Sequence, residues 1–192
     1  MITKRTRRAL FRVIIVLLFG FTLQRQSEAQ INSSTAGVLL TATLGELLTI
    51  SATPSAVTFS LVQGGVAVGS APVAIQTKWL LLPTRANIFL NGYFASATAA
   101  LTDGATTPDN IPASAVLGQM TTGSPTSYTA FTQNTVLGPV GAGLLLYTQS
   151  LTSLTRAVTR TDNLSIEINL TSLPQLPAGV YTGTLTLQAE AL

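Results

Sequence analysis

Apolar and polar residues alternate along most of the chain after its first thirty positions. The segment 163–170 (NLSIEINL) is the clearest case, with its four apolar residues at every second position. Successive side chains of a β-strand point to opposite faces, so this period of two predicts a half-buried strand rather than a helix. Residues 181–190 repeat the pattern, with threonines on the polar face.

Other segments either alternate in the same way or are apolar on both faces, as 86–94 is, which is typical of a central strand. These further strand candidates are 39–44, 47–52, 56–62, 73–81, 115–120, 128–133 and 143–151. Segments rich in Gly, Pro, Asp and Asn separate them and predict turns. Many short strands at even spacing predict an all-β fold, an antiparallel immunoglobulin-like β-sandwich of about 7–9 strands.

The first 29 residues have a different character. A basic head over residues 4–12 precedes an uncharged apolar run over 13–23, and small residues stand at the two positions that a signal peptidase reads. This order predicts a secretory signal peptide over 1–29, cleaved between Ala29 and Gln30. An uncleaved membrane anchor is the alternative, but the run is shorter than the roughly 20 residues that span a bilayer.

Residues 30–192 are long enough for a single domain. With a cleaved leader, the protein contacts the membrane only through the transient signal peptide. We therefore expect export to the periplasm, the cell surface or the extracellular space.

The composition excludes several kinds of chemistry. The chain has 192 residues, of which 46% are hydrophobic and only 9% charged, and it has no Cys and no His. Disulfides, thiol nucleophiles, Ser-His-Asp triads and Cys- or His-based metal sites are therefore absent. We expect a protein that is not an enzyme and has no cofactor.

The basic balance of the whole chain comes from the leader. Residues 30–192 hold four cations and six acids, a net charge of −2, so the formal charge of +3 is lost with the first 29 residues. A nucleic-acid-binding surface needs clustered cations, and the sequence after residue 29 has none, so we expect no nucleic-acid partner.

Two small groups of residues are candidates for ligand binding. Asp103 and Asp109 share the loop 101–110, where aspartates are turn formers first and weak calcium ligands second. Tyr93 and Tyr128 are the aromatic residues that could form a platform for a sugar ring. We expect packing and turn formation to account for most of the remaining aromatic and acidic residues.

The outward faces of the predicted strands are short of charge. Thr and Ser occupy positions where Lys and Glu usually stand. Lysines at sheet edges prevent pairing with another chain, and that protection is sparse here. Two interpretations stay open: a neutral hydroxyl-coated secreted domain, and a domain whose edges pair with neighbours.

The C-terminal segment 176–192 (LPAGVYTGTLTLQAEAL) resembles the end of bacterial pilin-like domains of the chaperone–usher and spore coat protein U type. Those domains often close with Pro-Ala-Gly-x-Tyr and an alternating terminal strand. The cysteines common in that family are absent from this chain. The resemblance implies an exported subunit whose sandwich lacks one strand, which the N-terminal extension of a neighbour supplies.

In this chain the extension would be residues 30–44. Its donor-strand candidates, at every second position, are Val38, Leu40, Ala42 and Leu44. The same alternation suits an ordinary first strand of the same domain, which is the interpretation preferred on sequence alone.

The sequence thus predicts an exported, non-enzymatic structural or adhesive surface protein, with like subunits as partners. A secreted module that binds carbohydrate or another ligand, with surface glycans as partners, is the alternative.

The leader yields the first testable prediction. The exported product of the full-length chain is expected to begin at Gln30, because the small residues before it suit cleavage after Ala29. N-terminal sequencing and intact mass measure this directly. A product that retains the apolar run over 13–23 contradicts it.

Overall fold

The computed structural model describes residues 34–192. The predicted signal peptide and its cleavage site at Ala29 and Gln30 lie outside the described residues. The chain divides into two units, 1–42 and 43–192, and every described strand belongs to the second. Within the described part, no helix has the length and apolar character needed to span a bilayer.

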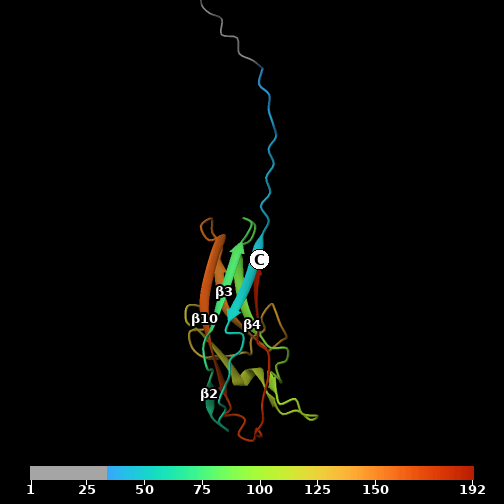
Figure 1. Cartoon of the computed structure of the whole chain (residues 1–192), viewed down its shortest axis with the longest axis vertical. Coiled ribbons are helices and arrows are strands. Elements are labelled where there is room, and N and C mark those ends of the chain that lie inside the picture. The colour runs from blue at the N-terminus through green and yellow to red at the C-terminus, as the bar shows by residue number, and fades with distance from the viewer. Residues whose placement is uncertain (1–33) are drawn as a thin grey trace, which may run out of the picture. The chain divides into compact units, whose positions relative to one another are not determined.

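The larger sheet has six strands, all antiparallel to their neighbours (Figure 1). Its main path runs β1 (Leu47–Thr53), β3 (Val73–Leu80), β10 (Ala157–Asn169), β7 (Val116–Met120) and β8 (Thr129–Ala130). The sixth strand, β2 (Val66–Val68), pairs with β10 beyond the end of β3.

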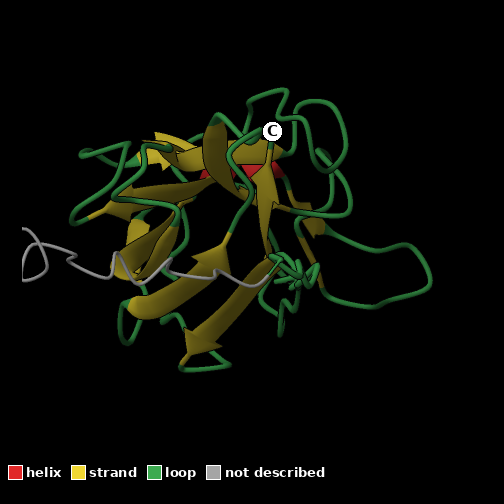
Figure 2. Cartoon of the chain, turned by 90° about the horizontal axis from the view of Figure 1, so that it is seen from above, coloured by secondary structure: helices red, strands yellow, loops and turns green. Residues whose placement is uncertain are grey.

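The second sheet has three strands, in the order β11 (Thr186–Ala191), β4 (Asn87–Tyr93) and β9 (Gly143–Ser150). The segment that the sequence predicts as a central strand, 86–94, does lie between two partners as β4. A two-stranded ribbon of β5 (Leu101–Thr102) and β6 (Asn110–Ile111) and a short 3₁₀ helix, η1 (Ala113–Ala115), lie in the connections (Figure 2). The expected all-β antiparallel sandwich is confirmed.

Strand β10 organises the larger sheet. Its 13 residues pair with β3 over 157–164 and with β7, on the other side, over 164–168. Its alternation continues along the whole length, so that Asp162, Leu164, Ile166 and Ile168 are all buried. The first half of β10 is therefore paired in strand ladders on one side only, toward β3.

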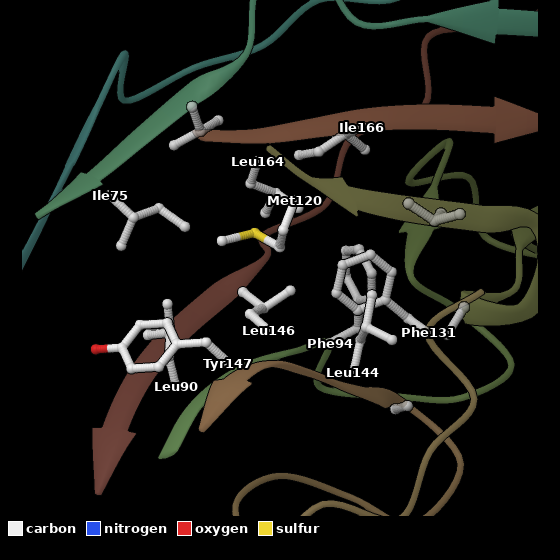
Figure 3. Packing of buried hydrophobic residues seen from close by; sticks show 14 of the residues in the cluster. Ile75, Leu90, Phe94, Met120, Phe131, Leu144, Leu146, Tyr147, Leu164 and Ile166 are labelled. Carbon is white, nitrogen blue, oxygen red and sulfur yellow. The ribbon is translucent and has the colours of Figure 1, made fainter. Parts of the chain in front are cut away.

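The core fills the space between the inner faces of the two sheets. Ile75 and Leu164 come from the larger sheet, and Leu90 and Leu146 come from the smaller one (Figure 3). The flexible side chain of Met120 lies among them, and all five are buried. Because the chain has no cysteine, this apolar burial and the sheet hydrogen bonds hold the fold together.

Some predicted strands are absent or shortened. Residues 56–62 form no strand, although Val57, Phe59 and Leu61 pack half-buried against the core. The Thr58 carbonyl accepts a hydrogen bond from the amide of Ser70 in a loop, so the alternation reflects burial without a ladder. The predicted strand 128–133 is reduced to the two residues of β8, and the last strand begins only at Thr186.

The interpretation of residues 39–44 as an ordinary first strand does not hold in this structure. Residues 34–46 form no strand and are exposed throughout, and the first strand of the sandwich begins at Leu47.

Truncation in the core gives the prediction for the fold. Leu164→Ala is expected to lower the free energy of unfolding by about 2–5 kcal/mol, because it leaves a cavity among fully buried neighbours. Leu154→Ala removes the same atoms from a loop side chain that is 89% exposed and is the control. Urea unfolding followed by circular dichroism measures both; equal midpoints for the two variants contradict the assignment of the core.

Candidate assembly seam

The two sheets each end in a strand with only one partner, and these two strands adjoin. In the larger sheet one end strand is β1, which pairs only with β3; in the smaller sheet one end strand is β11, which pairs only with β4. The opposite ends of the two sheets are β8 and β9. β1 and β11 contact each other along one side of the sandwich. We call this line, formed by β1 and β11, the open seam.

Side chains along the open seam are less buried than those of the neighbouring strands. Ile75 on β3 and Ile88 on β4 are both 0% exposed. The inward-facing residues of the edge strands, by contrast, are only half-buried against the same core; they are Leu48, Ile50, Leu187 and Ala189. The apolar interior is therefore incompletely covered along this line.

The backbone of β1 also has an unused side. In an antiparallel strand, the backbone groups of successive residues point to alternate sides. The amide of Leu81, directly after β3, bonds to the carbonyl of Arg156, so the odd-numbered residues of β3 face β10 and the even-numbered ones face β1. In the register of β1 with β3, Leu48, Ile50 and Ala52 therefore direct their amide and carbonyl groups away from β3.

β11 has an unused side as well. Leu192 exchanges hydrogen bonds with Asn87 at the start of β4. By alternation, Leu187, Ala189 and Ala191 direct their backbone groups away from β4. Both margins of the open seam thus present backbone donors and acceptors, beside half-buried apolar side chains.

The sequence-predicted donor residues lie in the exposed segment 34–46. Val38, Leu40 and Leu44 are 81%, 88% and 74% exposed, and Ala42 is exposed as well. These are large apolar side chains in an extended segment without secondary structure. If these side chains packed against the strands of a sheet, their apolar surface would be removed from water.

An ion pair anchors Glu46, the residue directly before β1. Glu46 accepts hydrogen bonds from the Arg85 guanidinium, at 3.2 and 3.1 Å, and from the amide of Leu82 at 3.0 Å. Arg85 in turn donates to the carbonyl of Ala191 in β11 at 3.4 Å. One arginine therefore connects the start of β1, the end of β11 and the loop before β4.

The bonds from Arg85 and Leu82 lower the pKa of the Glu46 carboxyl. A lowered pKa means that the contact is present above the pKa of the unfolded chain and is lost as the pH falls through the folded value. The ion pair between Glu46 and Arg85 is therefore fully formed at neutral pH and is weakened only in acid.

A second polar cluster lies away from the open seam, where the first half of β10 lacks a ladder partner. Arg160 holds Asp162 through two hydrogen bonds, at 2.7 and 2.9 Å, and stacks 4.3 Å above the ring of Tyr147. Thr122 donates its hydroxyl to Asp162, whose side chain is only 2% exposed. Bonding to Asp162 raises the pKa of Arg160, and burial raises the pKa of Tyr147.

Thr122, Arg160 and Asp162 line an open pocket of about 390 Å³, together with three further threonines. Its aromatic wall, Trp79, is itself buried and donates its indole N–H to the carbonyl of Thr155 at 2.8 Å. The Asp162 carboxylate is already engaged by Arg160 and Thr122. Arg160 also donates to Gln149 on β9, at 3.3 Å, so the cluster links the two sheets beside the half of β10 that lacks a second strand partner.

The structure brings the two calcium candidates together in one loop. The carboxylate of Asp103 accepts the amides of Ala105 and Asp109, at 3.1 and 3.2 Å, as expected of an aspartate in a turn. Within residues 34–192 there is no group of three or more acidic, His or Cys side chains that could hold a metal ion. Calcium binding stays a prediction.

The two tyrosines proposed as a sugar platform have different surroundings. Tyr93, at the end of β4, donates its hydroxyl to Gln188 on β11 at 2.8 Å. Tyr128 precedes β8 in the other sheet. The aromatic pair found among the described residues is a different one, Phe94 with Phe131 in the core.

No family model, no curated protein and no solved structure matches this chain. The site is therefore defined by its own geometry.

Sequence reasoning missed three arginines that connect different elements of the sandwich. Arg85 and Arg160 act as described above, and Arg156 donates to the carbonyls of Leu82 and Arg85. One signal was available: Arg160 and Asp162 are two residues apart in a strand, which places opposite charges on the same face. For Arg85 and Glu46, 39 positions apart, no local pattern existed.

Neutralising one acid of each ion pair gives the prediction for this region. Asp162→Asn is expected to destabilise the fold by about 3–5 kcal/mol, since it leaves the partly buried Arg160 without its counter-charge. Glu46→Gln is the matched control, because its pair with Arg85 is exposed and screened by water. Thermal unfolding should show a large drop in midpoint for Asp162→Asn and little change for Glu46→Gln; similar drops would contradict the distinction.

Proposed function

We propose that this chain is an exported structural subunit of a cell-surface assembly, in which residues 38–44 of one copy pair as a strand in the open seam of another. The observation that carries this proposal is the open seam itself. It combines unpaired backbone groups on both margins with apolar side chains that the subunit leaves half-covered. A strand added to the free edge of β1 would bond its unpaired backbone groups and cover the half-buried side chains beside it, which is the physical basis of recognition by strand addition.

The segment that would be added has the matching chemistry. Main-chain hydrogen bonds need only an extended backbone, and specificity comes from every second side chain. Val38, Leu40, Ala42 and Leu44 supply an apolar face with that spacing, and residues 34–46 engage in no strand of their own. The exposed surface of these residues in the isolated chain is typical of an interaction site.

The composition of the edge strands supports the same proposal. Edge strands normally carry charges, prolines or bulges that prevent pairing with other chains. β1 has the sequence LLTISAT, with no charge, and its register with β3 is unbroken over all seven residues. An unguarded edge of this kind is a liability for a monomer and an advantage for a subunit that polymerises.

Substitutions on the two faces of the extension test this proposal. Leu40→Asp should abolish assembly, because a carboxylate would have to enter the apolar side of the open seam. Leu39→Asp is the matched control, since residue 39 points to the opposite face of the added strand and its carboxylate would stay in water. Size-exclusion chromatography with light scattering measures the mass of the exported protein.

Removal of residues 30–44 should likewise leave a folded monomer, and a synthetic peptide of residues 34–46 should bind to it. Equal assembly of Leu40→Asp and Leu39→Asp, or an unfolded truncated chain that the peptide does not rescue, contradicts the proposal.

A further inference from the structure

We infer that the number of residues between the extension and β1 is what directs the extension to a second copy and keeps it out of its own seam. This inference rests on the proposed function and adds the choice of partner. The only connection between the donor residues and β1 is Gly45-Glu46. Leu44-Gly45-Glu46-Leu47 has glycine first in a two-residue loop, a sequence that favours a tight type II′ hairpin.

The backbone of β1 does not permit that hairpin. In a tight two-residue hairpin the residues that flank the loop exchange hydrogen bonds with each other, here Leu44 and Leu47. By the alternation argued above, the backbone groups of Leu47, Thr49 and Ser51 face β3 and are used there. The backbone groups available on the free edge belong to Leu48, Ile50 and Ala52. Their pairing is therefore shifted by one residue from the pairing that the hairpin requires.

The hairpin would also turn the side chains of the extension to the wrong faces. Directly opposed residues in a sheet project to the same face. Pairing of Leu44 with Leu47 would place Thr43 opposite Leu48 and Thr41 opposite Ile50, so that threonines would enter the apolar side of the seam. The donor residues would then face water, since a shift of one residue reverses every side chain of a strand.

A three-residue loop of Leu44, Gly45 and Glu46 would shift the pairing by one residue, so that the apolar face of the extension would again point to the apolar side of the seam. It would, however, use Leu44 in the loop, and it would place glycine in the middle instead of at the last, left-handed position. Glu46 is in addition bonded to Arg85 and to the amide of Leu82. A donor from a second copy has no loop to close, so it enters in the phase that buries Val38, Leu40, Ala42 and Leu44.

One inserted residue should therefore convert the assembling subunit into a self-completed monomer. The variant is Gly45→Asn with one glycine inserted after it, which gives an Asn-Gly loop of type I′ between Leu44 and Glu46. Leu44 then opposes Glu46, Ala42 opposes Leu48 and Leu40 opposes Ile50, with both backbone bonding and side-chain phase correct. The control is Gly45→Asn alone, which carries the same substitution at the native spacing and keeps Glu46 bonded to Arg85 and to the amide of Leu82.

Both variants and the unaltered chain are expressed at full length with the leader, and the exported products are compared by light scattering and amide hydrogen exchange. The insertion variant should be a monomer, reject the peptide of residues 34–46, and exchange the amides of Leu48 and Ile50 roughly tenfold or more slowly than a truncated monomer without residues 30–44. The control should assemble like the unaltered chain.

Assembly of the insertion variant at the level of the unaltered chain overturns this inference and leaves the proposed function standing. A control that becomes a monomer with a protected seam also overturns it, because spacing would then be irrelevant. If all three proteins are monomers with fast exchange at Leu48, the proposed function fails and the inference fails with it.

Discussion

The backbone of a β-strand has two sides that need hydrogen-bond partners, and a sheet that does not close leaves one side of each end strand without them. The rest of this structure depends on where those unpaired sides lie. In this chain the end strands β1 and β11 belong to different sheets and adjoin along one line. The unpaired groups and the partly covered core therefore coincide, which makes the line suited to an added strand.

Charge is scarce in this protein, and three of its arginines bond groups on other elements. Arg85 joins the residue before β1 to the end of β11, and Arg156 bonds two carbonyls of the loop between β3 and β4. Arg160, paired with Asp162, links the two sheets beside the half of β10 that lacks a second strand partner. β1 has no charged residue, whereas β11 carries Glu190. The margin of the open seam on β1 is therefore free of charges that would repel another chain.

Much of the fold was predictable because burial on one face of a strand leaves a local record. The alternation in 163–170 and 73–81 marks β10 and β3, and the doubly apolar 86–94 marks the central strand β4. The prediction was wrong for 56–62, where Val57, Phe59 and Leu61 pack on the core from a loop. Periodicity reports which side chains are buried, and it does not report whether a neighbouring strand is present to form a ladder.

The sequence by itself determined the all-β class, the exclusion of His and Cys chemistry, and the apolar spacing of Val38, Leu40, Ala42 and Leu44, because each of these is a property of composition or of neighbouring positions. Tertiary structure alone decided that residues 34–46 form no strand, that β1 and β11 adjoin, and that Arg85 bonds to Glu46. These features depend on contacts between residues far apart in the chain, and such contacts leave no pattern in the local order of residues.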